Sequence, residues 1–214
     1  PKDNKFNDIE YKNLLFVTKN GVVKRTSIDQ FSNINKNGKI AISLREDDEL
    51  VFVKPTTGNE EIIIAGSNGK AVRFNEDDVR LMGRSASGVR GFECDGSIVV
   101  GVATSLEGNT ILSVSENGYG KRSYLEDYRL TSRGKKGVRT INITEKTGNL
   151  ISVCAVTGNE DVMMVSSSGI MIRTSVENIG IYGRNTQGVR LMNLTEDAKV
   201  TKVTLVNREE ESEE

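Results

Sequence analysis

The amino-acid sequence repeats itself about every fifty residues, and this period limits the possible folds more than any other property of the chain. The first marker is a two-residue turn signal, Asn-Gly or Ser-Gly, whose glycines are spaced by 48, 49 and 51 residues. Because such pairs supply the positive φ angles of a tight hairpin turn, each one marks a predicted hairpin. The four signals are Asn20-Gly21, Asn68-Gly69, Asn117-Gly118 and Ser168-Gly169.

Two further markers keep the same step along the chain. Glycines that precede an extended segment are spaced by 50, 49 and 51 residues, and Gly-Asn pairs are spaced by 50 and 50. These markers are Gly38, Gly88, Gly137, Gly188, Gly58-Asn59, Gly108-Asn109 and Gly158-Asn159. Together they predict one domain or partial domain over residues 1–214, with units at about 13–59, 60–109, 110–159 and 160–207 and an acidic tail at 208–214.

Each unit has the pattern of four short β-strands. It opens with an apolar run, such as Leu14 to Val17, that is too short for a helix and rich in β-forming residues, which predicts a strand buried on both faces. The hairpin turn and a second strand follow, such as Val22 to Thr26, and then two more strands, such as Lys39 to Leu44 and Glu49 to Lys54. The pattern predicts an all-β, propeller-like fold of four-stranded antiparallel blades.

Aligning the units brings basic residues into columns. A first column lies four residues after each turn glycine, and two of its arginines follow a lysine: Lys24, Arg25, Arg73, Lys121, Arg122 and Arg173. Units two to four also share the pattern R-x-x-x-G-V-R, and the third unit adds two lysines to it: Arg84, Arg90, Arg133, Lys135, Lys136, Arg139, Arg184 and Arg190. The first unit departs from the pattern, since Ile34 and Ile40 take the two arginine places.

Equivalent residues of a radial array fall on one rim, so these columns predict a basic track. Arginine side chains and nearby backbone N–H groups contact phosphate oxygens without reading base sequence. We therefore predict that these fourteen residues bind duplex DNA. For the first column, a structural role is the alternative to DNA binding: an ion pair inside the blade. An acid follows each arginine of this column by four residues, namely Asp29, Asp77, Glu126 and Glu177.

Several kinds of site are not supported by the composition. The chain has no histidine, which removes imidazole ligands and imidazole acid–base catalysis. Cys94 and Cys154 form no C-x-x-C motif, which favours a reducing compartment over a disulfide framework. Neither a phosphate-binding P-loop nor a membrane-spanning apolar run occurs. We predict no catalytic residue, metal or cofactor in this fragment; a propeller-type interaction scaffold and a carboxylate-based propeller enzyme remain the alternatives.

The formal net charge of −1 conceals a basic body. Residues 209–214 hold five glutamates, and without them 25 acidic residues stand against 29 basic ones. We predict that this tail competes weakly with DNA for the basic rim, since it is tethered but screened by salt. A solvated end without a role is the alternative. Because the chain begins with Pro1, we also expect it to be a piece of a longer protein.

Three longer strings resemble the C-terminal region of the DNA gyrase A protein. They are Glu116 to Arg122, Ile181 to Val189 and Met82 to Gly91, and the resemblance runs in register over about residues 13 to 207. It implies a β-pinwheel, a propeller-like disc whose neighbouring blades exchange strands and whose basic rim wraps duplex DNA with a positive hand. The related domain of topoisomerase IV shares this architecture and is the alternative within the same family.

The resemblance also implies a larger enzyme, an ATP-dependent type II topoisomerase that introduces negative supercoils. Its ATP, its Mg²⁺ and its DNA-cleaving tyrosine would lie outside this fragment. Its partners would be the gyrase B protein and the N-terminal part of the gyrase A protein, in the bacterial cytoplasm at the nucleoid, with no membrane. The seven-residue gyrase box, Gln-Arg-Arg-Gly-Gly-Lys-Gly, is missing, and its nearest likeness is Ser132 to Gly137 in the third unit. Since the family domain usually has six blades, we expect the chain to begin after the blade that bears the box.

Overall fold

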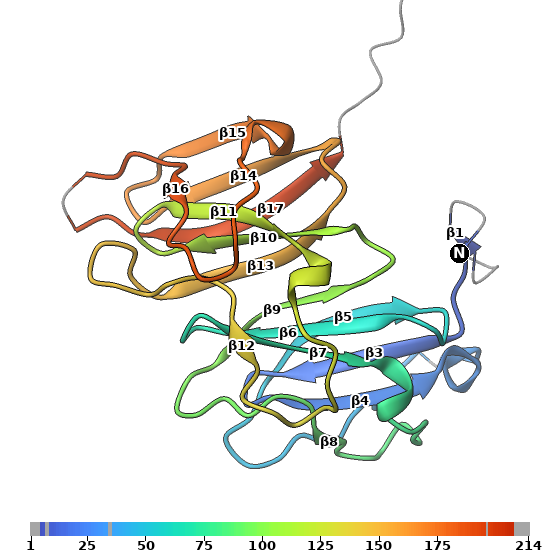
Figure 1. Cartoon of the computed structure of the whole chain (residues 1–214). Helices are drawn as coiled ribbons and strands as arrows, with labels where there is room; N and C mark the ends of the chain where they lie inside the picture. Colours follow the sequence, from blue (N-terminus) through green and yellow to red (C-terminus); the bar gives the residue numbers. More distant parts are fainter. Residues whose placement is uncertain (1–4, 7–8, 34–35, 196, 208–214) are drawn as a thin grey trace, which may run out of the picture.

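The computed structural model confirms the all-β class, and it describes residues 5–6, 9–33, 36–195 and 197–207. The predicted acidic tail, residues 208–214, and Ile34 lie outside the described residues. The units follow one another through the molecule, from the blue strands to the orange and red ones (Figure 1). In the described residues, no helix is long and apolar enough to cross a membrane.

Each unit contributes three longer antiparallel strands. In the first and second units these are β3 (Asn13–Thr18), β4 (Val22–Ser27), β5 (Leu50–Thr56), β6 (Glu61–Gly66), β7 (Lys70–Asn75) and β9 (Val99–Thr104). In the third and fourth they are β10 (Thr110–Ser115), β11 (Tyr119–Tyr124), β13 (Leu150–Val156), β14 (Glu160–Ser166), β15 (Met171–Ser175) and β17 (Val200–Asn207). A short 3₁₀ turn follows the second strand of every unit: η1 (Ile28–Phe31), η2 (Glu76–Asp78), η3 (Leu125–Asp127) and η4 (Val176–Asn178). A separate two-stranded ribbon, β1 (Lys5–Phe6) and β2 (Ile9–Glu10), precedes them.

The fourth strand of a blade comes from the following unit. The two-residue strand β8 (Val89–Arg90) pairs with β4, β12 (Val138–Arg139) pairs with β7, and β16 (Val189–Arg190) pairs with β11. The prediction of a strand at Lys39 to Leu44 is wrong, because such a segment becomes a strand only against the outer edge of a preceding unit. The fourth unit forms a three-stranded sheet, and no described strand pairs with the outer edge of β15.

The turn glycines allow this exchange. Gly21 and Gly118 adopt φ angles of 84° and 81°, and a Cβ at either one would lie within 2.5 Å of a carbonyl oxygen of the next unit. The glycine carbonyls accept backbone hydrogen bonds of 2.8 Å from Gly91 and Leu191. Glycine therefore serves both the hairpin turn and the close approach of the neighbouring unit.

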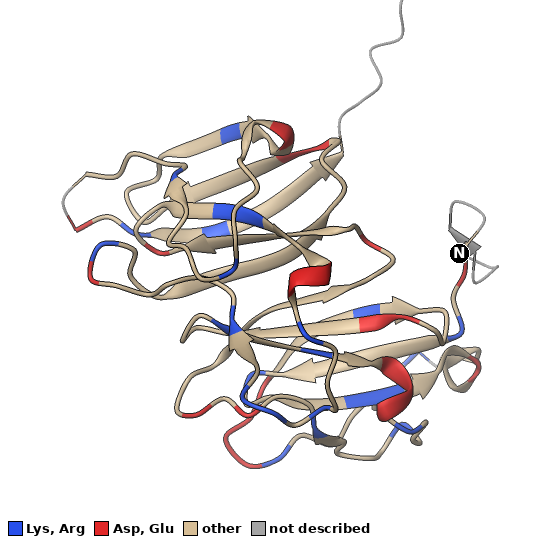
Figure 2. Ribbon diagram, in the orientation of Figure 1, with Lys and Arg blue, Asp and Glu red and all other residues tan. Residues whose placement is uncertain are grey.

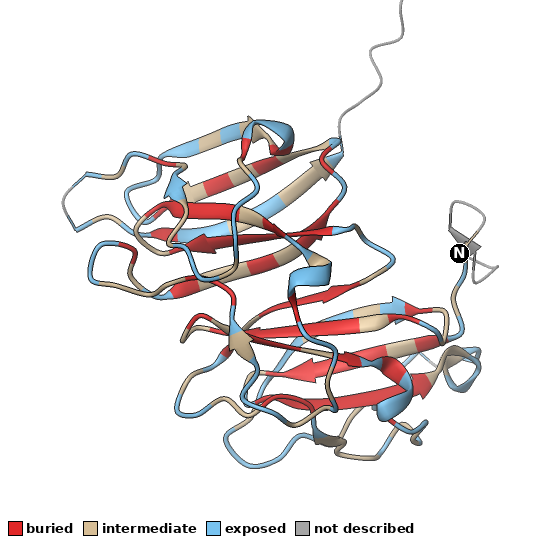
Figure 3. Cartoon of the chain, viewed as in Figure 1, coloured by how far each residue is buried: buried red, intermediate tan, exposed pale blue. Residues whose placement is uncertain are grey.

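The hydrophobic core lies between successive units. Ile62 and Ile64 of β6 pack in one buried cluster with Leu15 of the first unit, while Ile63 packs in a second cluster with Ile111 of the third. A third cluster joins the last two units. The first strand of an inner unit is thus buried on both faces, as its uninterrupted apolar run predicts. Figure 3 shows the buried positions concentrated along these strands and the loops largely exposed.

Candidate nucleic-acid interface

Three basic loops run along the outer edges of the preceding blades, and we call them the rim loops: residues 79–92, 128–141 and 179–192. Each loop is fixed by a backbone hydrogen bond to an arginine carbonyl, from Met82 to Arg25 (2.8 Å), from Thr131 to Arg73 (2.9 Å) and from Tyr182 to Arg122 (2.8 Å). Each loop then forms the two-residue strand that completes that blade. Figure 2 shows Lys and Arg both on these loops and on the strands beside them.

The first arginine column joins blades. Arg25 is 7% exposed, and its Nη1 donates to Glu76 (3.0 Å) and Asp77 (2.8 Å) in η2 of the following unit. The alternative of pairing inside one blade is therefore wrong for Arg25, because Asp77 rather than Asp29 is its partner.

The next two arginines of the column also contact the following unit. Arg73 donates to the carbonyls of Leu125 (3.0 Å) and Tyr128 (2.9 Å), besides forming an ion pair with Glu61 of its own unit. Arg122 donates to the carbonyl of Ile179 at 2.7 Å. In the fourth unit, Arg173 pairs with Asp161 of that unit and has a side chain that is 54% exposed.

Lys24 and Lys121 lie inside the protein. Both are fully buried, and Lys121 Nζ donates to the carbonyls of Gly183 and Arg184, while Lys24 Nζ donates to those of Ala41 and Arg84. Burial, followed by the charge of Arg184, lowers the pKa of Lys121 to about 8. Since neither side chain reaches the surface, we do not carry these two residues into the proposed interface.

The first arginine of each R-x-x-x-G-V-R pattern is half-buried and ties its loop to the preceding one. Nη1 of Arg133 donates to the carbonyl of Arg90 at 2.9 Å, and Nη1 of Arg184 donates to that of Arg139 at 2.7 Å. Arg84 donates to the carbonyl of Ile40 in the same way, at 3.1 Å. Arg133 and Arg184 thus tie successive rim loops together, and Arg84 ties the first rim loop to the first unit.

The last arginine of each pattern is exposed: Arg90, Arg139 and Arg190. Arg90 pairs with Glu93 and Lys136 with Asp95, whereas Arg139 and Lys135 form no ion pair within the described residues. Arg80 and Arg129 are also exposed, four residues before the first arginine of the pattern. The sequence alignment missed these two because the fourth unit has Gly180 in that place and leaves the column incomplete.

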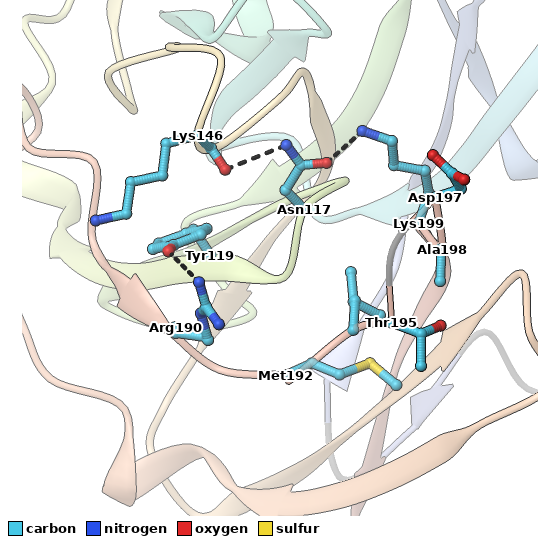
Figure 4. Close-up of a pocket in the computed structure, with 10 residues that line it drawn as sticks. Asn117, Tyr119, Lys146, Arg190, Met192, Thr195, Asp197, Ala198 and Lys199 are labelled. Atoms are coloured by element: carbon cyan, nitrogen blue, oxygen red, sulfur yellow. Dashed lines mark hydrogen bonds between the residues drawn. The ribbon is translucent and has the colours of Figure 1, made fainter.

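An open pocket between the third and fourth units gathers further cations (Figure 4). Lys146 Nζ and the Arg190 guanidinium lie 5.3 and 5.4 Å from the centroid of the Tyr119 ring. A hydrogen bond from Arg190 holds the pKa of Tyr119 below its usual value. On the other side of the pocket Lys199 contacts Asn117. Lys146 is an exposed cation that sequence comparison between the units did not find, because the first unit has Asp47 in the corresponding loop.

Comparison with known proteins gives a consistent match. A family profile described as "DNA gyrase C-terminal domain, beta-propeller" matches residues 12–57, 60–103, 109–154 and 160–207. The chain is 49% identical over 202 residues to the DNA gyrase A protein of Staphylococcus epidermidis (strain ATCC 12228 / FDA PCI 1200), and 48% identical over 203 residues to that of Staphylococcus aureus (strain NCTC 8325 / PS 47). These alignments cover 93% and 94% of this chain but only 23% of each relative.

Two solved structures are similar in fold. The C-terminal domain of DNA gyrase A has a TM-score of 0.81 at 28% sequence identity, covering 92% of this chain and 67% of that one. The C-terminal domain of DNA topoisomerase IV has a TM-score of 0.85 at 25% identity, covering 94% of this chain and 64% of that one. Both solved domains are therefore longer than the chain described above.

Proposed function

The chain belongs to the DNA gyrase C-terminal domain family, and on that premise we propose that it binds, bends and wraps duplex DNA without strong sequence preference through its rim loops. The observation that carries this proposal is the repetition of one exposed arginine, as Arg90, Arg139 and Arg190, on loops that are anchored identically to successive blades. Because each loop is anchored in the same way, the exposed arginines lie at regular intervals along the rim.

The physical case rests on phosphate neutralisation. Smooth bending of a site of about 20–30 base pairs costs on the order of 1–6 kcal/mol. One surface cation cannot offset that cost, but a series of cations can, because each neutralised phosphate releases condensed counterions. Arg80, Arg129, Lys135 and Lys146 add exposed cations to the series. Contacts to phosphates position a duplex without specifying its bases.

We also propose the place of this domain in a larger enzyme. The chain spans about a quarter of the length of the curated relatives it matches. The rim would deliver DNA to the rest of a gyrase, where ATP, Mg²⁺ and the strand-cleaving chemistry of negative supercoiling belong. The gyrase B protein and the N-terminal part of the gyrase A protein are the protein partners in this proposal, and the bacterial nucleoid is the location.

Two alternatives carry less support. The topoisomerase IV domain has the higher TM-score, 0.85 against 0.81, but identity near 49% to curated gyrase A proteins favours gyrase. A protein-interaction scaffold would leave the repeated cations without a role. Binding to DNA separates the scaffold from the proposed function.

The test is a titration of a random-sequence duplex of about 40 base pairs at about 50 and 200 mM salt. The variant Arg90→Ala, Arg139→Ala, Arg190→Ala should flatten the dependence of log affinity on log salt by about 2.7, since each lost phosphate contact removes about 0.9. A matched control with the same change in charge, Lys12→Ala, Lys54→Ala, Lys202→Ala, lies outside the rim loops and should keep the wild-type slope. Equal effects in both variants, or a wild-type slope worth only one or two phosphates, would overturn the proposal.

A further inference from the structure

Each rim loop exposes a large aliphatic side chain at the same repeat position, and the third loop also exposes Val189. Leu81 is 55% exposed, Leu130 45% and Ile181 37%, and the three occupy the same position in successive units. Isolated exposed apolar residues are ordinary on protein surfaces. These three side chains, in contrast, recur at one repeat position on the loops that carry the exposed arginines. They therefore form a repeated feature of the rim.

The position of these side chains is fixed by the preceding blade. Leu81 forms a β-bridge with Arg25, Leu130 with Arg73 and Ile181 with Arg122. The N–H of the residue that follows each aliphatic bonds to the carbonyl of that same arginine at 2.8 to 2.9 Å. The aliphatic side chains therefore lie at equivalent positions, on backbone that hydrogen bonds to the preceding blade hold in place.

Arginines flank these side chains in sequence, while acidic residues of η2 and η3 lie three and four residues before Leu81 and Leu130. Arg80 and Arg84 flank Leu81 in sequence, and Arg129 and Arg133 flank Leu130 at the same distances. Ile181 has only the arginine on its C-terminal side, since Gly180 precedes it. Arginines beside an exposed apolar side chain favour a polyanion that also offers apolar surface over a plain hydrophobic protein patch.

We propose that Leu81, Leu130 and Ile181 contact DNA directly, by packing against deoxyribose in the minor groove where the duplex curves over each blade. The inference rests on the DNA binding proposed above and adds an apolar component to it. Proteins that bend DNA combine arginines in a narrowed minor groove with apolar side chains against it. Each rim loop offers the same combination, an exposed aliphatic side chain with an arginine near it in the sequence.

Apolar contacts and phosphate contacts differ in their response to salt. Burial of apolar surface contributes roughly 25 cal/mol per Å² and releases no counterions, so its contribution does not depend on salt concentration. Removal of the three side chains should therefore weaken binding by at least about tenfold at every salt concentration, with the slope unchanged. Removal of arginines changes the slope instead.

The experiment compares two triple variants on the same duplex at about 50, 100 and 200 mM salt. The rim variant is Leu81→Ser, Leu130→Ser, Ile181→Ser, and the control is Val51→Ser, Val53→Ser, Leu106→Ser, whose side chains are 37%, 45% and 43% exposed away from the rim loops. The expected result is parallel lines of log affinity against log salt, with the rim variant displaced and the control coincident with wild type. Wild-type affinity in the rim variant, the same loss in the control, or an altered slope overturns the inference.

A second measurement covers the case in which the rim variant unfolds. A photoreactive p-benzoylphenylalanine at Leu130 should crosslink to the duplex, and the same group at Leu106 should not. Absence of a crosslink at Leu130, while the protein still binds DNA, overturns the inference alone. Failure of the wild-type protein to bind the duplex overturns the proposed function, so the two failures are distinguishable.

Discussion

The hydroxyl of Tyr119 accepts a 2.8 Å hydrogen bond from Nη2 of Arg190, which lies 71 residues later in the chain. The two residues also face each other in the pairing of β11 with β16. Tyr119 therefore orients an exposed rim arginine from a blade that belongs to the preceding unit. This pair therefore connects the strand exchange between units with the proposed DNA contact.

Replacing Tyr119 with Phe should weaken DNA binding by about two- to tenfold, because a hydrogen bond contributes on the order of 0.5–1.5 kcal/mol to the placement of Arg190. Fluorescence titration of a labelled duplex measures the change. Tyr182→Phe is the control, since Tyr182 is 41% exposed and its hydroxyl forms no hydrogen bond to the described part of the chain. Equal affinities for Tyr119→Phe and the wild type would show that Arg190 needs no such support.

Substitutions within the first arginine column should differ strongly in their effect on stability. Arg25→Ala leaves the fully buried Glu76 without its cation, and breaking a buried pair in this way costs about 3–5 kcal/mol. Arg173→Ala removes a pair whose arginine side chain is 54% exposed and should cost under about 1 kcal/mol. Urea unfolding of both variants measures the difference. Similar losses would mean that the junction between the first two blades does not depend on Arg25.

Lys121→Met should reduce stability without a direct effect on DNA binding. Its ammonium group holds two carbonyls of the following rim loop, and hydrogen bonds from charged groups contribute about 1.5–3 kcal/mol. The melting temperature should fall by roughly 4–8 °C. Lys146→Met, at an exposed cation, should have the reverse effect: an unchanged melting temperature and weaker binding at low salt. Loss of DNA affinity in a fully folded Lys121→Met protein would contradict the structural role.

The carboxyl of Glu60 should make the protein less stable at alkaline pH. Burial, and then its hydrogen bond with Glu76, raise the pKa of Glu60 to about 7. A raised folded-state pKa gives stability that is present below the ordinary pKa and is lost as the pH rises through about 7. Glu60→Gln, which resembles the protonated form, should therefore raise the melting temperature by about 2–4 °C at about pH 8 and much less at about pH 5.

Glu160 is a control at the same repeat position. Burial opposes its ionisation, but hydrogen bonds from Thr157 and Gly158 outweigh burial and lower the pKa of Glu160. A lowered pKa gives stability above the ordinary value that is lost as the pH falls, so Glu160→Gln should lower the melting temperature at about pH 8. A stabilising Glu160→Gln, or a Glu60→Gln effect that does not change with pH, would contradict this account.

Features that depend on neighbouring residues could be predicted from the sequence. The Asn-Gly turns, the apolar run of each first strand and the period of about fifty residues predicted an all-β repeat array. The R-x-x-x-G-V-R pattern also located the loops on which the exposed arginines lie. These signals are local, because a positive φ angle and a strand that is buried on both faces each restrict the residues at their own positions.

The tertiary structure alone decided which basic residues are exposed. Lys24 and Arg90 are both basic residues of repeated columns, yet Lys24 is buried against one carbonyl of its own unit and one of the next, while Arg90 faces solvent. The fourth strand of each blade, such as Val89–Arg90, is too short to carry an alternating pattern. Its paired residues in β4 lie 66 and 68 positions earlier in the chain, and Arg25 forms its ion pair with Asp77 across 52 residues. Contacts over such separations depend on how whole blades pack, and no spacing within a single unit encodes them.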